Sequence, residues 1–186
     1  MSRRVFTFEE PDRFVAGTVG RPGSRTFFLQ ARDRGRVVSV VLEKAQVAVL
    51  AERLGALLDE LGRRGLDLPE SGAVQQDTAP LDEPINEAFR AGTLTLTWDG
   101  ERERIIVEAR EIVPDEDDEP VEIDDVVEDD IDGPDLIRVV MEPATARGFA
   151  DQATSIVLAG RLPCPLCGQP LDPQGHICPR KNGYLN

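Results

Sequence analysis

The C-terminal tail gathers the residues best suited to bind a metal ion. The three cysteines of the chain (Cys164, Cys167 and Cys178) and its single histidine (His176) fall within fifteen residues. Thiolates and an imidazole this close together are the ligands of tetrahedral zinc sites. Gly168 follows the first Cys-x-x-Cys pair, where the backbone must curl toward sulfur. The sequence therefore predicts one structural zinc ion per chain, bound by Cys164, Cys167, His176 and Cys178.

The second half of this tail departs from the usual zinc ribbon, in which another Cys-x-x-Cys pair would place a thiol at position 181. Lys181 stands there, and His176 lies two residues before Cys178. Residues two apart in an extended strand project from the same face, so both can reach one ion. Three other interpretations stay open: a disulfide with a spare thiol, a redox-active pair, and a catalytic zinc with an open position.

Two segments carry a resemblance to a known family. The tail AGRLPCPLCGQPLDPQGHICPRKNGY and the early segment DRFVAGTVGRPGSRTFFLQAR resemble a family of high-GC Gram-positive bacteria catalogued as domain of unknown function 3090. The resemblance covers nearly the whole chain. It implies that the tail and the N-terminal glycine-rich segment are hallmarks of the family, and that the protein is cytoplasmic. It implies no activity.

The negative charge of the chain is concentrated in one segment. The net charge is −14, yet thirteen acidic residues and no basic one lie between Asp115 and Asp135, which leaves the rest near −1. We expect residues 112–135 to be an acidic insertion, either a solvated loop or a segment that folds onto a basic protein partner or back onto this protein. We do not expect duplex nucleic acid as a partner, because proteins that bind it present a basic face.

The chain shows no segment that would place it in a membrane. No apolar run approaches the roughly 18 residues needed to span a bilayer, and the N-terminus lacks an apolar signal core. Reduced thiols suit the cytoplasm. We expect a cytoplasmic protein that does not contact membranes.

Two helices with the same apolar spacing are predicted over residues 44–62 and 143–159. Apolar residues recur at intervals of three and four in both, which is typical of one buried helix face. Adding 99 to the first six apolar positions of the first helix gives those of the second. They are Val47, Leu50, Ala51, Leu54, Leu57 and Leu58, against Ala146, Phe149, Ala150, Ala153, Ile156 and Val157.

The predicted strands repeat as well, with an offset of 78. FFLQAR at residue 27 corresponds to IIVEAR at residue 105, and FVAGTV at residue 14 to GTLTLT at residue 92. The offsets differ by 21 residues, which matches the acidic insertion between the second and third strands of the second half. Asp99-Gly100 favours a two-residue type I′ turn. Residues 64–91 are predicted to connect the halves, and residues 4–9 to add an edge strand.

These patterns predict an α+β fold built from two strand-strand-strand-helix units, with a largely antiparallel sheet and both helices on one face. Half one spans about 12–62 and half two about 92–159. Together they form a duplicated domain over residues 1–160, followed by a zinc-knuckle tail over residues 161–186.

Few other residues suggest chemistry. Gly17, Gly20 and Gly23 suggest a phosphate loop, but no Gly-Lys-Ser/Thr follows, so a hairpin connection is favoured, with its arginines free to pair with an acidic or phosphorylated partner. Glu43 and Glu142 each precede one of the two helices. Each carboxylate would be stabilised by the positive end of its helix dipole, or the pair would bind a cation or act as acid and base. A Ser-His-Asp triad is excluded if the only histidine binds zinc.

The leading hypothesis is a non-enzymatic binding or regulatory protein that contacts a protein partner through the acidic insertion. One alternative is an enzyme that uses carboxylates and arginines on a small phosphorylated substrate in a cleft between the halves. Another is nucleic-acid contact through the zinc tail, where Arg161, Arg180 and Lys181 lie near the metal ligands. A pocket lined by converging polar residues would favour the enzyme.

Overall fold

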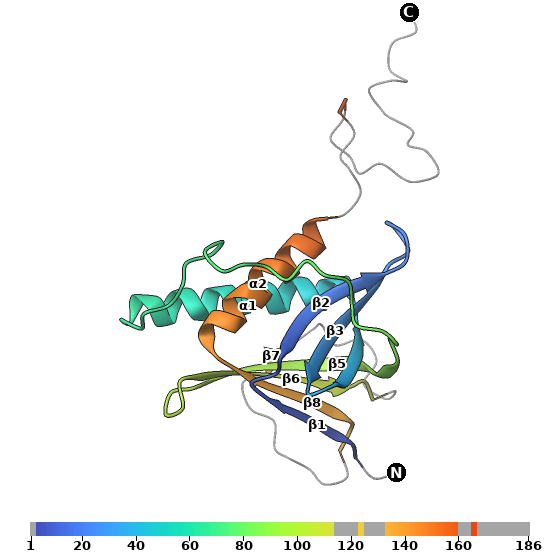
Figure 1. Cartoon of the computed structure of the whole chain (residues 1–186), viewed down its shortest axis with the longest axis horizontal. Coiled ribbons are helices and arrows are strands. Elements are labelled where there is room, and N and C mark those ends of the chain that lie inside the picture. The colour runs from blue at the N-terminus through green and yellow to red at the C-terminus, as the bar shows by residue number, and fades with distance from the viewer. Residues whose placement is uncertain (1–2, 114–122, 125–132, 160–164, 167–186) are drawn as a thin grey trace, which may run out of the picture.

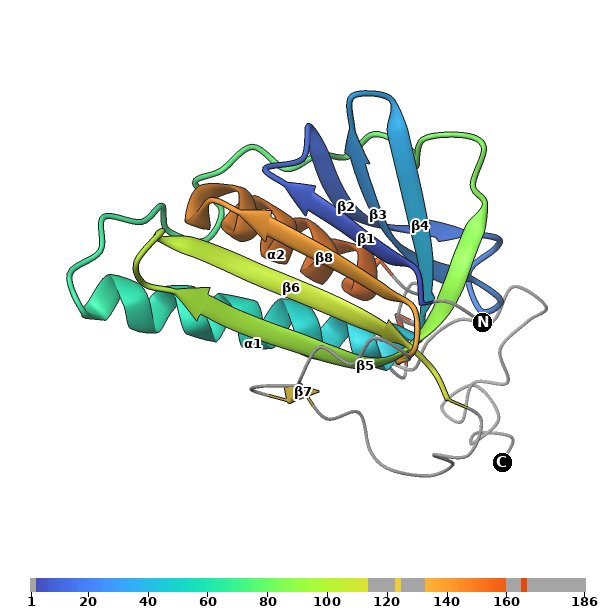
Figure 2. The same cartoon turned by 90° about the horizontal axis from the view of Figure 1, so that it is seen from below.

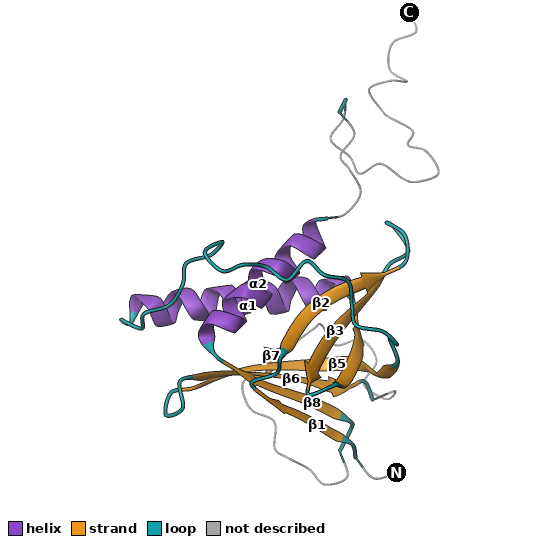
Figure 3. Cartoon of the chain, in the orientation of Figure 1, coloured by secondary structure: helices purple, strands orange, loops and turns teal. Residues whose placement is uncertain are grey.

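The computed structural model describes residues 3–113, 123–124, 133–159 and 165–166. These residues form an α+β fold in which both helices lie on one side of a curved sheet, as predicted (Figures 1 and 3). No helix among them is long and apolar enough to cross a membrane. In chain order the elements are β1 (Val5–Glu9), β2 (Arg13–Val19), β3 (Thr26–Asp33), β4 (Arg36–Leu42), α1 (Lys44–Arg63), β5 (Glu87–Asp99), β6 (Arg104–Glu111), β7 (Ile123–Asp124), β8 (Leu136–Met141) and α2 (Pro143–Leu158).

The described strands form one sheet in the order β1-β8-β6-β5-β4-β3-β2, with β7 beside β5. The pairs within each half are antiparallel, whereas β4 with β5, β8 with β1, and β5 with β7 are parallel. The predicted strand at residues 4–9 is β1, and it lies at an edge as expected.

The sheet is rolled so that its two ends approach each other (Figure 2). Only three residues separate β1 from β2, yet these strands stand at opposite ends of the strand order. The side chain of Arg36, on β4, donates a hydrogen bond to the carbonyl oxygen of Thr7 on β1. Its guanidinium also lies 4.2 Å from the centre of the Phe8 ring. The inward face of the rolled sheet therefore encloses a single core.

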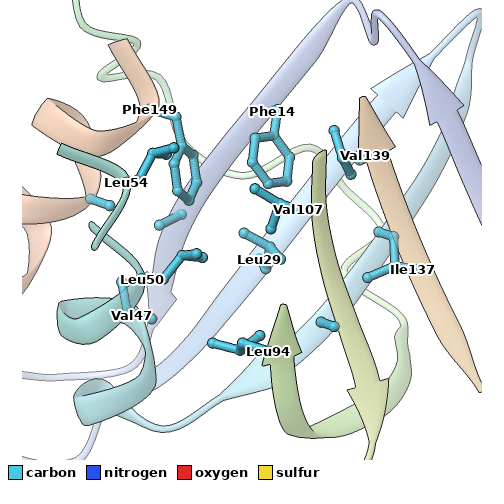
Figure 4. Packing of buried hydrophobic residues seen from close by; sticks show 14 of the residues in the cluster. Phe14, Leu29, Val47, Leu50, Leu54, Leu94, Val107, Ile137, Val139 and Phe149 are labelled. Atoms are coloured by element: carbon cyan, nitrogen blue, oxygen red, sulfur yellow. The ribbon is translucent and has the colours of Figure 1, made fainter. Parts of the chain in front are cut away.

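The two helices cover the open side of this core with the apolar faces that the sequence predicts. Leu50 and Leu54 of α1 are buried, and the Phe149 ring of α2 stacks on Phe14 of β2 with centroids 4.4 Å apart (Figure 4). Each such side chain contributes about 1.5–3 kcal/mol when fully buried. The helix α1 ends where Gly65 adopts a left-handed φ of 98° that suits glycine.

The two halves have the same connectivity, strand directions and strand order, as the internal repeat predicts. Phe27 pairs with Leu42 in half one, and Ile105 pairs with Met141 in half two. These partners are related by the offsets of 78 and 99 that the sequence suggested. Val40 and Val139 therefore occupy equivalent positions in the third strand of each half. Superposition of the halves stays a prediction, as does the domain boundary at residue 160.

The structure corrects three details of the second half. Leu94, and not Gly92, is equivalent to Phe14, because both pair with the equivalent alanines Ala109 and Ala31. The first strands are thus offset by 80. The hairpin between β5 and β6 has four loop residues, so Asp99-Gly100 is not a two-residue turn. The Asp99 carboxylate instead accepts the backbone N–H groups of residues 101 and 102.

The third correction concerns the start of half two. The sequence pattern predicts residues 87–91 as part of the connector, but they are the first part of β5, which pairs with β4. Phe89 and Ala91 are buried there. The connector is therefore residues 64–86.

Candidate functional site

The predicted zinc ligands Cys164, Cys167, His176 and Cys178 lie outside the described residues, so the zinc site stays a prediction. Of the tail, only Pro165 and Leu166 are described. Within the described part of the chain, no group of three or more histidine, cysteine, aspartate or glutamate side chains is arranged to bind a metal.

The glycine-rich loop lies beside the end of α2, where the tail begins. The Arg25 side chain donates a 2.8 Å hydrogen bond to the carbonyl oxygen of Ala159. Gly20 and Gly23 have φ values of 103° and 96°, which glycine adopts without strain. A Cβ on Gly20 would lie 2.7 Å from the carbonyl oxygen of Ser24. The glycines thus serve a β-hairpin turn, as the favoured interpretation predicted.

A small basic pocket adjoins this loop at the N-terminus of α1. It has a volume of about 200 Å³, and Arg25, Lys44, Arg90 and Glu43 contribute its charged lining. Glu43 is the N-cap of α1, and its carboxylate accepts a 2.9 Å hydrogen bond from Arg90. Three cations and one carboxylate leave the pocket with a positive balance.

The acidic insertion starts next to the same pocket. The backbone N–H of Ile112 donates a 2.9 Å hydrogen bond to the carbonyl oxygen of Arg90. A Cβ on Gly92 would lie 2.9 Å from the Cα of Ile112, so the glycine allows the two backbones to approach. The tail and the acidic insertion therefore leave the folded core close to one another.

The predicted borders of the insertion, residues 112 and 135, are both hydrogen-bonded to the folded core. Asp135 is 8% exposed, and its carboxylate accepts hydrogen bonds of 2.7 Å from the backbone N–H and 2.6 Å from the side chain of Arg4. Its carbonyl oxygen also accepts the N–H of Glu111 at 2.8 Å. Asp135 therefore fixes the start of β1 to that of β8, and the insertion proper is narrower than 112–135.

Part of the insertion returns to the sheet. The strand β7 pairs in parallel with β5, with Ile123 opposite Leu94 and Asp124 opposite Thr95. It pairs with the same edge of β5 as β4 does but further along the strand, because β4 pairs with β5 only as far as Arg90.

A larger pocket, of about 560 Å³, lies between the connector and half two. Its charged lining comprises Arg64, Arg104, Asp67, Glu103 and Glu142. Acidic groups outnumber basic ones, and Arg104 already contacts Glu10 at 2.6 Å and Glu142 at 3.5 Å. This composition is unfavourable for a phosphorylated substrate.

The two symmetric carboxylates do not converge. Glu43 and Glu142 are the N-cap residues of α1 and α2, where a carboxylate favours the positive end of the helix dipole. They line different pockets, each beside its own arginine. The placement fits a structural role at the helix ends.

Sequence reasoning missed the network that binds the connector to the sheet. All five N–H donors of Arg13 are used: two reach the Asp77 carboxylate, one reaches that of Asp82, and two reach the carbonyl oxygens of Ala79 and Pro80, at 2.6–2.9 Å. The hydrogen bonds that Arg13 donates are the main reason why the pKa values of Asp77 and Asp82 lie below the ordinary value of an aspartate. The same hydrogen bonds raise the pKa of Arg13.

Buried glutamine side chains form a second feature that the sequence did not reveal. The Gln152 carboxamide accepts the N–H of Ala16 at 3.2 Å and donates to its carbonyl oxygen at 2.7 Å. Gln30 bonds the backbone N–H and carbonyl of Asp82 in the same way, at 2.8 and 3.0 Å. Each carboxamide thus pairs with both backbone groups of one residue, Ala16 on the edge strand β2 or Asp82 in the connector.

A family model described as "Protein of unknown function (DUF3090)" matches residues 6–178. The chain belongs to this family. The DUF3090 match covers both halves of the sheet, the acidic insertion and the four predicted zinc ligands, which confirms the resemblance seen in the sequence. No curated protein and no solved structure matches the chain.

Proposed function

We propose that this DUF3090 protein is a cytoplasmic, zinc-containing binding or regulatory protein, and that its acidic insertion is the element that contacts a protein partner. The observation that carries the proposal is the distribution of charge. Twelve carboxylates and no basic residue occupy residues 115–132, while the rest of the chain is nearly neutral. A partner with a basic surface would be attracted to this segment, and the attraction would weaken as salt screens it.

The way in which the core holds the insertion supports this role. Ile112 and Asp135 fix its two ends by hydrogen bonds to the sheet. Both ends of the segment are thus anchored to strand ends of the core. One zinc ion bound by Cys164, Cys167, Cys178 and His176 would order the neighbouring tail in the same region.

The enzyme alternative has less support among the described residues. The pocket of about 560 Å³ between the connector and half two contains more acidic than basic residues. Its Arg104 is engaged by two carboxylates, so a phosphate group would have to displace them.

The test is affinity capture from native lysate with the full-length protein as bait. One variant replaces the acidic residues of 115–130 with their amides, and a control variant keeps the same residues in scrambled order. We expect a partner that elutes with salt and is lost from the amide variant. Equal capture by the amide variant would contradict the proposal, and capture by the scrambled control would show that charge alone suffices.

A second candidate, nucleic-acid contact through the tail, is favoured by one observation. The basic pocket formed by Arg25, Lys44 and Arg90 lies beside Ala159, where the tail begins. An anionic strand could therefore run from the tail onto this pocket. Fluorescence anisotropy with a labelled single-stranded oligonucleotide, repeated with Lys44→Gln and Arg90→Gln, tests this. No salt-sensitive binding by the wild-type protein would exclude it.

A further inference from the structure

The basic pocket beside α1 has the size and lining of a site for one small anionic group. Its three cations come from separate elements, because Arg25 precedes β3, Lys44 begins α1 and Arg90 lies on β5. The volume of about 200 Å³ is below the roughly 300–1,000 Å³ of pockets that enclose drug-sized ligands. A water molecule occupies about 30 Å³ in the liquid, so the pocket holds the equivalent of about six of them. That space suits a phosphate-sized group.

All three cations keep donors for a ligand. Among the described residues, Arg25 donates a hydrogen bond to the carbonyl oxygen of Ala159, and Arg90 donates one to the Glu43 carboxylate. A guanidinium group has five N–H donors, so several remain on each arginine. The Lys44 ammonium group forms no ion pair with any described carboxylate. Three positive charges against the one negative charge of Glu43 give the pocket a balance of +2.

The internal repeat shows which features of this pocket the fold itself requires. The second strands of the two halves are offset by 78, so Arg25 corresponds to Glu103. The helices are offset by 99, so Lys44 corresponds to Pro143. Glu103 and Pro143 line the larger pocket of half two, so the two pockets occupy equivalent places in the fold.

The position of Arg90 carries the opposite charge in half two. Arg90 lies opposite Val41 on the strand that pairs in parallel with β4. Glu9 lies opposite the equivalent Val140 on the strand that pairs in parallel with β8. Half two therefore builds the same strand ends and the same helix start without any of the three cations. The cations of half one are thus not a requirement of the architecture, which is expected if they serve a ligand.

We propose that the pocket formed by Arg25, Lys44 and Arg90 binds a dianionic phosphate group, either as free phosphate or as the end of a small phosphate monoester. The balance of +2 matches the two charges of such a group. The remaining guanidinium donors match its oxygen atoms in bidentate geometry. The pocket has room for little more than the phosphate, so the rest of a monoester would extend into solvent. No residue of the acidic insertion lines the pocket, so this site does not depend on the proposed function.

Titration of the full-length protein with inorganic phosphate, followed by amide chemical shifts at constant ionic strength, tests the site. At about pH 8 the phosphate carries close to two negative charges. We expect saturable shifts at residues 25–27 and 43–46. Lys44→Gln should weaken binding at least about tenfold, because a charge-assisted hydrogen bond is lost. Lys44 is exposed, so this variant should fold normally.

Arg64→Gln is the matched control. It makes the same change in net charge, but Arg64 lines the pocket of half two, so this variant should bind phosphate as the wild type does. Arg25→Gln should behave like Lys44→Gln. Absence of saturable shifts in the wild type, or equal affinity in wild type, Lys44→Gln and Arg25→Gln, would overturn the proposal.

Two further probes distinguish the sources of the phosphate group. Phenyl phosphate is a dianionic monoester, whereas dimethyl phosphate is a singly charged diester that resembles a nucleic-acid backbone. Binding of phenyl phosphate with an affinity near that of phosphate would support a monoester ligand, and binding of phosphate alone would support the free ion. Dimethyl phosphate should bind at least about tenfold more weakly than phosphate, because it has one charge fewer. Equal binding of dimethyl phosphate would overturn the dianion assignment and favour a nucleic-acid strand in this pocket.

Discussion

Replacing Arg13 should release the connector from the sheet. The Arg13 side chain is 9% exposed, and all five of its N–H groups donate hydrogen bonds to the connector. Arg13→Met keeps the aliphatic stem but removes every donor. Hydrogen bonds to charged groups contribute about 1.5–3 kcal/mol each, and breaking one side of a buried network costs about 3–5 kcal/mol. Asp77 and Asp82 keep exposures of 38% and 24%, so water can rehydrate them. We therefore expect a loss near the lower limit, about 3 kcal/mol.

Urea unfolding at pH 7 measures this loss as a lower midpoint with an unchanged slope. The thermal midpoint should fall by about 6–12 °C. Arg13→Lys should recover only part of the loss, because an ammonium group cannot serve two carboxylates in the fixed fork geometry. Arg34→Met is the matched control, since Arg34 is 92% exposed and should matter little. A loss below about 1 kcal/mol in Arg13→Met would refute the reasoning.

The free energy of unfolding that Arg13→Met loses relative to wild type should depend on pH. Arg13 lowers the pKa of Asp77 and Asp82 from the ordinary 3.8, so these groups bind protons more weakly in the folded than in the unfolded state. Their stabilising effect is therefore complete above about pH 4 and is lost as the pH falls through the lowered values. The difference in unfolding free energy between wild type and Arg13→Met should shrink below pH 4. A constant difference from pH 7 to pH 3 would contradict the assigned cause.

Other predictions follow from the site and from the fold. Elemental analysis of protein purified under reducing conditions should find one zinc per chain, and Cys164→Ser should lower that content; a metal-free wild type would disprove the site. Deleting residues 114–132 should leave a folded protein with a thermal midpoint within about 3 °C of wild type, whereas Asp135→Ala should lose about 2–4 kcal/mol because Arg4 loses its buried partner. Circular dichroism melts compare the two, and an unfolded deletion variant would contradict the first part. Gln152→Ala should cost about 1–3 kcal/mol in urea unfolding, since both backbone groups of Ala16 lose their partner; no change would show that water replaces the amide.

The sequence predicted those parts of the fold that depend on periodic burial. Both helices were predicted to within one residue at each end, because their apolar faces recur at the helical period over four or more turns. The slip of the first strand of half two by two positions has a physical cause. A shift of two residues in a strand returns every side chain to the same face, so the burial pattern does not distinguish the two alignments.

The candidate site was predicted less completely, because its contacts depend on residues distant in sequence. Gln152 and Ala16 are 136 residues apart, and nothing in a polar residue on a helix indicates that it will pair with an edge strand. Likewise, Asp135 belongs to the acidic run by composition, and only the position of Arg4 makes it part of the core. The anchors of the insertion and the charge balance of the pockets therefore required the structure.

The pairing of β1 with β8 has a consequence for the order in which the protein can fold during synthesis. The residues that this pair brings together are 131 positions apart, as for Arg4 and Asp135. A ribosome that adds roughly 5–20 residues per second needs on the order of 10 s or more to produce the partner of β1. Strands β2–β4 and helix α1 can assemble during that interval, while Phe6 and Phe8 have no strand beside them. The strand β1 is thus synthesised well before β8, the strand with which it pairs.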